Sequence, residues 1–250
     1  MPKRKVDSLF AFPDFGTTNG RRHATLQTIS THTMKDFKNI FFDLGGVLFN
    51  LNTRAAFRAF KALGMGIPDE IIADNQPLNG MPEGQEIVRL IHSMDLGKVR
   101  GAEFMEIVKR ECRPGTTEAE ILHAYNGMIE VPVTRLELLK RLRSKYKIYL
   151  LSNIGDLHWE AARNMAAAVG YPMEECFDHC FCSFEMGVAK PDPVIFERAI
   201  AESGVVPEET LYIDDFDANI EAGRRAGLLA YKIVGNTLEQ HVPILFPEFC

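Results

Sequence analysis

Short apolar segments that alternate with amphipathic ones constrain the fold of this chain more than any other feature. Apolar runs of strand length recur at Ile40–Phe42, Ile148–Leu151, Cys180–Phe184, Leu211–Ile213 and Leu229–Val234. Segments with helical periodicity separate the later runs: Arg135–Tyr146, Leu157–Val169, Val194–Ser203 and Ala218–Ala226. Strands separated by helices are typical of βαβ units. The sequence therefore predicts an α/β fold with a doubly wound parallel sheet.

The stretch that follows the first apolar run breaks this alternation. It contains only helical patterns, at Thr53–Leu63, Glu83–Met94, Ala102–Cys112 and Thr117–Ile129. Thr117 followed by Glu120 resembles a capping box that opens the last of these helices. We therefore expect residues 36–52 and 132–250 to form the core domain. Residues 53–131 are predicted to form a helical cap, inserted over the edge of the sheet.

The composition narrows the class of protein. The 28 basic and 34 acidic residues give a net charge of −6, which argues against nucleic acid or an anionic membrane as the partner. The five cysteines lack the spacing of a secreted disulfide framework, which predicts free thiols in a reducing compartment. No apolar run reaches the length of a membrane-spanning helix, so we expect a cytoplasmic protein. The sequence carries no signal for an oligomeric state.

The two ends of the chain differ from the rest. Residues 1–35 show no period and are rich in Thr, Ser and Gly, which predicts a flexible arm. Residues 2–6 resemble a short basic nuclear-import signal, a pattern that also arises often by chance. At the other end, the apolar residues of 241–250 could pack on the core or on a partner.

The first strand ends in a carboxylate that is followed closely by two glycines. Asp43 precedes Leu44, Gly45 and Gly46, and such glycines let backbone N–H groups approach an anion closely. A carboxylate on this turn could attack phosphorus and form an aspartyl phosphate that water then cleaves. Taken alone, Asp43 could equally cap a turn.

The next two strand ends add groups suited to an anion. Ser152 and Asn153 supply a hydroxyl and an amide that could hold phosphoryl oxygens, although both residue types also cap helices. Lys190 follows the third strand in a loop stiffened by Pro191 and Pro193. Its point charge could neutralise both the attacking carboxylate and the phosphoryl group.

The fourth strand end carries two adjacent carboxylates, Asp214 and Asp215, with Asn219 nearby. Neighbouring carboxylates repel each other, so a cation or a lysine must compensate them. Oxygen ligands of this kind suit Mg²⁺, which also serves as a clamp in phosphoryl transfer. Alternatively, Asp214 and Asp215 could belong to an ordinary charged loop at the start of a helix.

In chain order these groups are Asp43, Ser152, Lys190 and the pair Asp214-Asp215, and this order resembles the four motifs of the haloacid dehalogenase superfamily. The resemblance covers roughly residues 38–234 and implies a Rossmann-like core with a helical cap after the first strand. It also implies hydrolase activity. The segments around the first two motifs are most similar to the subgroup of bacterial α-D-glucose-1-phosphate phosphatases. The N-terminal phosphatase domain of soluble epoxide hydrolases is a more distant match.

The same resemblance implies a role for each matching residue. Asp43 would be the nucleophile and a metal ligand, with Asp215 and the carbonyl of Gly45 as further ligands. Asp214 would pair with Lys190 or belong to the outer shell of the metal, together with Asn219. The implied cofactor is Mg²⁺, and the implied partner is a small phosphoester substrate.

One position departs from the superfamily pattern. Most phosphatases of the superfamily carry an acid/base aspartate two residues after the nucleophile, and this chain has Gly45 there. Proton transfer by such a residue contributes about 100- to 10,000-fold in rate. The substrate could have a good leaving group, another residue could supply the proton, or the chemistry could be lost. His158 is the first candidate for a replacement acid because imidazole titrates near neutrality, with His92 and Glu83 as weaker candidates. His158 could equally be a packing residue in the first turn of its helix.

Three functions follow from these residues. The first is a magnesium-dependent phosphatase for a small phosphorylated metabolite, such as a sugar phosphate. The second is a binding or regulatory protein that has kept the fold and lost turnover. The third is a haloacid dehalogenase, which also lacks the aspartate at the position of Gly45 but needs no metal, so the pair Asp214-Asp215 argues against it. Zinc is not expected at Cys176, Cys180 and Cys182, because no second pair stands at ligand spacing, and buried thiols are predicted instead.

Overall fold

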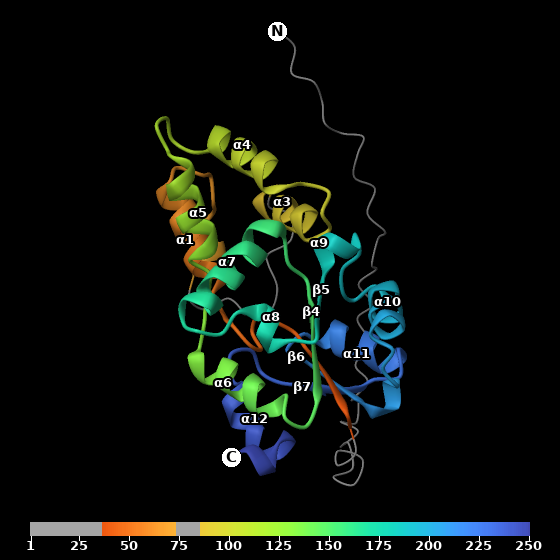
Figure 1. The fold of residues 1–250 in the computed structure, drawn as a ribbon. Coiled ribbons are helices and arrows are strands. Elements are labelled where there is room, and N and C mark those ends of the chain that lie inside the picture. The colour runs from red at the N-terminus through yellow and green to blue at the C-terminus, as the bar shows by residue number, and fades with distance from the viewer. Residues whose placement is uncertain (1–36, 74–85) are drawn as a thin grey trace.

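A computed structural model of the chain describes residues 37–73 and 86–250. The predicted arm at 1–35 and the candidate acid Glu83 therefore lie outside the described residues. Within the described part, a β-sheet with helices on both faces forms a core, and a separate group of helices lies beyond one end of the sheet (Figure 1). None of the helices described is both long enough and apolar enough to cross a membrane.

The core sheet has five strands in the order β5-β4-β1-β6-β7, and every neighbouring pair is parallel. The strands are β1 (Asn39–Phe42), β4 (Lys147–Ser152), β5 (His179–Cys182), β6 (Thr210–Asp214) and β7 (Leu229–Lys232). The chain starts at the centre with β1, builds β4 and β5 on one side, and then builds β6 and β7 on the other. This order confirms the predicted doubly wound sheet. It also brings the carboxyl ends of β1, β4 and β6 together, which is where such sheets bind ligands.

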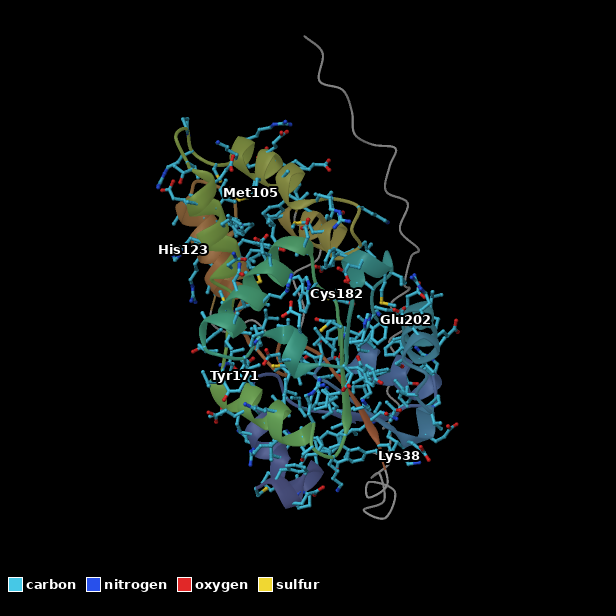
Figure 2. All side chains as sticks on the ribbon, in the orientation of Figure 1. Lys38, Met105, His123, Tyr171, Cys182 and Glu202 are labelled. Atoms are coloured by element: carbon cyan, nitrogen blue, oxygen red, sulfur yellow. The ribbon has the colours of Figure 1, made fainter. Side chains whose placement is uncertain are left out.

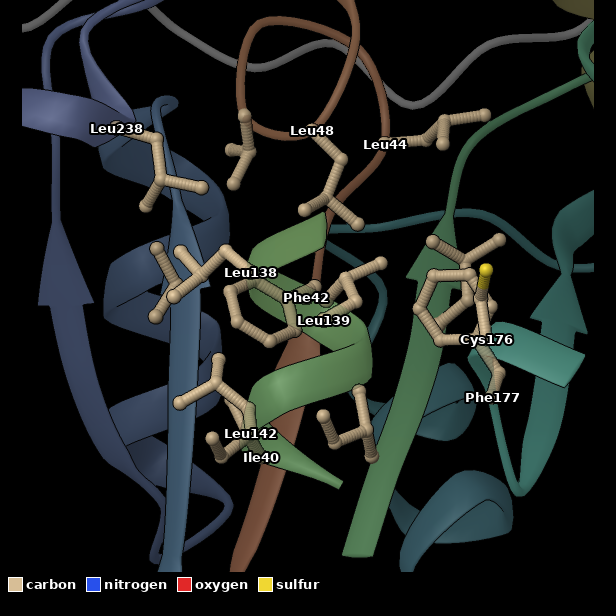
Figure 3. Packing of buried hydrophobic residues seen from close by; sticks show 14 of the residues in the cluster. Ile40, Phe42, Leu44, Leu48, Leu138, Leu139, Leu142, Cys176, Phe177 and Leu238 are labelled. Atoms are coloured by element: carbon tan, nitrogen blue, oxygen red, sulfur yellow. The ribbon is translucent and has the colours of Figure 1, made fainter. Parts of the chain in front are cut away.

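Helices cover both faces of the sheet because alternate strand residues point in opposite directions. Ile40 and Phe42 of β1 belong to one buried cluster, whereas Phe41 between them belongs to the cluster on the other face. Figure 3 shows the first cluster, in which α6 packs across the central strands. The core helices are α6 (Val133–Leu142), α7 (Asp156–Ala168), α8 (Met173–Cys176), α9 (Ser183–Met186), α10 (Pro193–Ser203), α11 (Asp217–Arg225) and α12 (Leu238–Leu245). Two 3₁₀ turns accompany them, at Pro207–Glu209 and Pro247–Phe249.

The C-terminal segment packs on this chain's own core. Leu245 and Phe246 are buried in the same cluster as β1 and α6, which decides a point that the sequence left open. The cysteines are free thiols, as predicted. Burial raises the pKa of Cys176 to about 11 and that of Cys180 to about 12, so both side chains are protonated near neutrality.

Between β2 (Asn50–Leu51) and β3 (Ile129–Glu130), the helices α1 to α5 form what we call the helical insert. Its helices are α1 (Thr53–Ala62), α2 (Asp69–Ile72), α3 (Glu86–Asp95), α4 (Gly101–Glu111) and α5 (Glu118–Asn126). The predicted capping box of Thr117 and Glu120 opens α5. Buried side chains of these helices form a hydrophobic cluster of their own, and Figure 2 labels Met105 and His123 on this part of the molecule.

A two-stranded antiparallel sheet links the insert to the core. It consists of β2 (Asn50–Leu51), where the chain enters the insert, and β3 (Ile129–Glu130), where it returns. The insert also touches the core elsewhere. A Cβ on Gly97 would lie 2.3 Å from the carbonyl oxygen of Phe184, and one on Gly155 would lie 2.9 Å from the Cβ of Met94. Glycine is therefore required at these two places for the helices of the insert to pack against α7 and α9.

Candidate active site

The site forms where three parallel strands end side by side. Asp43 follows the last residue of β1 directly, Ser152 is the last residue of β4, and Asp214 is the last residue of β6. Their closeness follows from the register, because Phe42 of β1 is aligned with both Leu150 of β4 and Ile213 of β6. The sheet thus brings Ser152 and Asp214 next to Asp43, from which each is more than 100 residues distant in the sequence.

Lys190 lies at the centre of this site. Its ammonium group donates to Asp43 Oδ1 at 2.9 Å, to Asp214 Oδ2 at 2.7 Å and to the backbone carbonyl of Leu151 at 2.8 Å. Only 1% of its side chain is exposed. Burial opposes the charge, but the two carboxylates outweigh it and raise the pKa of Lys190. Since an ammonium has three donors, all of them are used within the protein.

Asp214 is the acceptor at the other end of this contact and is completely buried. Besides Lys190, its carboxylate accepts hydrogen bonds from the Tyr212 hydroxyl at 2.5 Å, from Phe216 N at 2.8 Å and from Asn219 Nδ2 at 3.1 Å. Burial alone would raise its pKa, yet Lys190 and these hydrogen bonds lower the pKa of Asp214 below its ordinary value. Its lone pairs are therefore occupied, which suits a residue that holds Lys190 rather than a metal ligand.

Asp43 and Asp215 have the opposite character. Burial raises the pKa of Asp43 to about 6, although Lys190 acts in the other direction. Burial, with repulsion from Asp43 and Asp214, raises the pKa of Asp215 to about 7. One ligand oxygen from each of the three aspartates lies within 4.8 Å of the others. Two under-compensated carboxylates so close together form a donor set that fits a hard divalent cation such as Mg²⁺.

Two glycines make room for the carboxylate of Asp215. A Cβ on Gly46, whose φ is +80°, would lie 2.3 Å from Asp215 Oδ2, and one on Gly235 would lie 2.7 Å from the same atom. Gly45 differs, because a Cβ there would meet only the Leu51 side chain, at an ordinary 3.6 Å. Gly46 and Gly235 are thus sterically required, whereas the space beside Gly45 admits a Cβ.

The two predicted phosphate-binding residues of the second strand end have different surroundings. Ser152 is buried, with 2% exposure, at the carboxyl end of β4. Asn153 instead pairs with the backbone of Lys190: its Nδ2 donates to the Lys190 carbonyl at 2.8 Å, and its Oδ1 accepts from the Lys190 N–H at 2.7 Å. The amide of Asn153 therefore holds the loop that carries Lys190.

The candidate replacement acids lie among insert contacts. The His158 ring stacks on Tyr125 of α5, with ring centroids 3.6 Å apart, and its Nε2 donates to the Tyr125 carbonyl at 3.1 Å. Burial lowers the pKa of His158 to about 4, so it is uncharged near neutrality. Burial, and after it Lys98, also lowers the pKa of His92 on α3. These surroundings favour the packing role that the sequence also allowed for His158.

The sequence analysis did not single out three residues that shape the site. Tyr212 lies within an apolar strand pattern, and only its hydroxyl on Asp214 distinguishes it from a core aromatic. Arg135 is 3% exposed and donates to the carbonyl of Val47, in the loop after Asp43. Asn236 contacts the same loop through its backbone, because its N–H donates to the Gly46 carbonyl at 2.6 Å. The polarity pattern of the sequence does not distinguish these three residues from ordinary core or surface positions.

Comparisons with known proteins identify the family of this chain. The family model of haloacid dehalogenase-like hydrolases matches residues 37–227. The chain is 30% identical over 198 residues to the D-ribitol-5-phosphate phosphatase of Bacteroides thetaiotaomicron, covering 78% of this chain and 91% of that protein. It is 25% identical over 190 residues to the glyceraldehyde 3-phosphate phosphatase of Pyrococcus furiosus, covering 73% and 74%.

Solved structures show the same similarity. A HAD family enzyme from Bacteroides thetaiotaomicron superposes with a TM-score of 0.72 at 30% identity, covering 83% of this chain and 98% of that one. The same enzyme in complex with magnesium and inorganic phosphate superposes with a TM-score of 0.70 at 29% identity, covering 82% and 98%. A dehalogenase at 17% identity has a TM-score of 0.54 and shares the fold. The narrower resemblance to glucose-1-phosphate phosphatases stays a prediction.

Proposed function

The chain belongs to the haloacid dehalogenase-like hydrolase family, and we propose that it is a magnesium-dependent phosphatase acting on a small phosphorylated metabolite. One observation carries this proposal: Lys190 is shared between Asp43 and Asp214, while Asp43 and Asp215 lie together with raised pKa values. Such a site holds a carboxylate ready for attack beside a place for a divalent cation.

In the first step, an oxygen of Asp43 attacks phosphorus, and the bond from phosphorus to the alcohol oxygen breaks. The leaving oxygen takes a proton from solvent and departs as an alcohol, because Gly45 carries no acid group. Asp43 loses its carboxylate charge when the acyl phosphate forms, and the phosphoryl group keeps its own negative charge. Lys190 loses part of its attraction to Asp43 in that state, so one of its donors can turn to a phosphoryl oxygen. In the second step, water attacks the acyl phosphate at phosphorus, releasing inorganic phosphate and restoring the Asp43 carboxylate.

The remaining residues of the site have supporting roles in this proposal. Asp43, Asp215 and the carbonyl of Gly45 would hold Mg²⁺, which supplies charge neutralisation for the phosphoryl group when bound. Ser152, at the end of β4, would donate its hydroxyl to a phosphoryl oxygen. Asn153 would act through the loop of Lys190, because its amide is paired with the Lys190 backbone.

The names of the relatives support a small polyol or sugar phosphate as the substrate class. Two curated relatives are phosphatases of D-ribitol-5-phosphate and of glyceraldehyde 3-phosphate. The substrates in these two names are short, hydroxylated carbon chains that end in a phosphomonoester. We propose a substrate of this class, held between the sheet edge and the helical insert.

Phosphate release from a panel of sugar and polyol phosphates, with Mg²⁺ and with chelator, tests the proposal. We expect release that requires Mg²⁺ and falls by at least about 1,000-fold in Asp43→Asn, because removal of a nucleophile abolishes the covalent route. Asp217→Asn is the matched control, since Asp217 is an exposed aspartate paired with Lys232.

Three results would contradict the phosphatase. Release that ignores chelator or survives Asp43→Asn would exclude the mechanism. Absence of release from every ester would favour the binding protein that Gly45 allows. Halide release from a 2-haloacid without metal would favour the dehalogenase.

A further inference from the structure

The loop after β7 joins three parts of the site that are far apart in the sequence. Gly235 approaches Asp215 so closely that a Cβ would lie 2.7 Å from Asp215 Oδ2. The next residue, Asn236, donates its backbone N–H to the Gly46 carbonyl at 2.6 Å. Its backbone carbonyl accepts from the buried Arg135 at 3.0 Å. This loop therefore fixes the turn that follows Asp43 and borders the carboxylate of Asp215.

The side chain of Asn236 reaches a different element, the entry strand of the insert. Its Oδ1 accepts from Leu51 N at 2.9 Å, and its Nδ2 donates to the Leu51 carbonyl at 3.2 Å. On the other edge of β2, Asn52 N donates to the Met128 carbonyl at 2.7 Å. The amide of Asn236 thus satisfies both backbone groups of Leu51, in the way a neighbouring strand would.

Asn236, whose side chain contacts Leu51, has a left-handed backbone conformation. Its φ is +66°, and it is the non-glycine residue with positive φ in the described part of the chain. Glycine adopts this conformation at lower cost than asparagine. An amide side chain stands here although glycine would fit the backbone better, so the gain comes from what the side chain contacts, which is Leu51.

Leu51 in turn lies against the turn of the nucleophile. The nearest atom to a Cβ built on Gly45 is Leu51 Cδ2, at 3.6 Å. Asn236 therefore holds the Gly45–Gly46 turn from two sides: directly through the Gly46 carbonyl, and indirectly through Leu51. The same amide fixes the strand on which the insert begins.

From these contacts we infer that Asn236 is a positioning residue that couples the helical insert to the turn after Asp43. The Asn236 side chain ties β2 to the Gly45–Gly46 turn and to the loop beside Asp215, so that these three segments move as one unit. The kinetic consequence of this inference rests on the proposed phosphatase function, but the mechanical coupling does not.

Three variants at Asn236 separate the side chain from the backbone. Asn236→Gly keeps the left-handed backbone and its two backbone hydrogen bonds but removes the amide. Asn236→Asp keeps the acceptor for Leu51 N and loses the donor to the Leu51 carbonyl. Asn236→Ala loses the amide and strains the backbone as well. Asn50→Ala is the matched control, because the Asn50 side chain donates to Glu130 Oε2 within the same two-stranded linker.

Hydrogen exchange of the metal-free protein is the first readout. In Asn236→Gly we expect the Leu51 amide to exchange at least about 10-fold faster, while amides of β1 and β6 keep their wild-type rates. Asn236→Asp should fall between Asn236→Gly and wild type. Unchanged exchange at Leu51, or faster exchange throughout the sheet, would overturn the coupling.

Steady-state kinetics is the second readout. We expect kcat of Asn236→Gly to fall by about 10-fold, since small displacements of reacting groups are costly, while KM stays within about threefold. Partial rescue in Asn236→Asp would support positioning, whereas loosened Leu51 with wild-type kcat would overturn it. The exchange measurement needs no turnover, so a failure of the proposed phosphatase would be recognised separately.

Discussion

The sheet edge and the helical insert differ in how fully their buried polar groups are hydrogen-bonded. At the edge, Lys190 and Asp214 are almost completely buried, and each is saturated with hydrogen bonds. The insert is built around an apolar cluster. Two polar atoms buried there, Tyr125 Oη and Asn126 Oδ1, have no hydrogen-bond partner among the described residues.

This difference indicates what each region can tolerate. A buried ion network is costly to break because each member leaves another charge without compensation. An apolar helical cluster is held by packing, which accepts volume-conserving changes at small cost. We therefore expect substitutions at the sheet edge to remove activity and stability together, and volume-conserving substitutions at the insert contacts to have small effects.

The largest effect is expected for Lys190→Met, which has a similar length and no charge. It leaves Asp43 and Asp214 facing each other without a cation. We expect turnover to fall by at least about 1,000-fold and the free energy of unfolding to drop by about 3–5 kcal/mol. Urea denaturation and phosphate release would measure the two effects.

Lys232→Met is the control for this substitution. Lys232 pairs with Asp217 at 2.6 Å at the surface, where such pairs contribute about 0–1 kcal/mol. If Lys190→Met were as stable as Lys232→Met, the buried ion pairs of Lys190 would contribute no more to the free energy of unfolding than a surface pair does.

The next effect concerns pH and metal at Asp215. Because its pKa is raised to about 7 in the folded protein, the folded state binds this proton more tightly than the unfolded state does. Asp215 therefore contributes stability to the metal-free protein at acidic pH, and this contribution is lost as the pH rises from about 4 to about 7. Asp43, with its pKa raised to about 6, contributes in the same direction.

Asp215→Asn should flatten this pH dependence, and it should abolish the increase in Tm that Mg²⁺ gives the wild type above neutral pH. Thermal melts across the pH range, with and without Mg²⁺, would measure both. Equal stabilisation of the variant and the wild type by Mg²⁺ would exclude Asp215 as a ligand.

The residues at the strand ends could be predicted from the sequence, whereas the contacts made by the loops could not. The strand ends could be predicted because apolar runs and the parallel-sheet rule place Asp43, Ser152 and Asp214 together without knowledge of any loop. The pairing of Asn153 with the Lys190 backbone could not be predicted, because an asparagine amide can equally cap a helix, bind phosphate or pair with a loop. Asn236 gave no signal, since its contact with Leu51 spans 185 residues and depends on a left-handed backbone.

A smaller effect, in the direction of higher activity, is expected for Gly45→Asp. Gly45 is not among the positive-φ glycines, and a Cβ there would meet only the Leu51 side chain, at van der Waals distance. A carboxyl at this position could protonate a poor leaving group. We expect kcat for alkyl phosphates to rise by up to about 100-fold, with little change for aryl phosphates, whose leaving groups need less help.

Gly45→Asn is the matched variant, since it has nearly the same size and no titrating proton. An equal response of Gly45→Asp and Gly45→Asn would attribute the change to shape. No response of alkyl phosphates to Gly45→Asp would mean that another group already supplies the proton.

The smallest effect is expected where the insert meets the core, at His158. Phenylalanine keeps a ring to stack on Tyr125 and loses only the hydrogen bond from Nε2 to the Tyr125 carbonyl. We expect His158→Phe to lower the free energy of unfolding by about 1 kcal/mol. Because burial lowers the pKa of His158 to about 4, the kcat profile between pH 5 and 8 should keep its shape. If that profile lost a limb, His158 would be the missing acid, and the insert would share in the chemistry that the sheet edge otherwise performs.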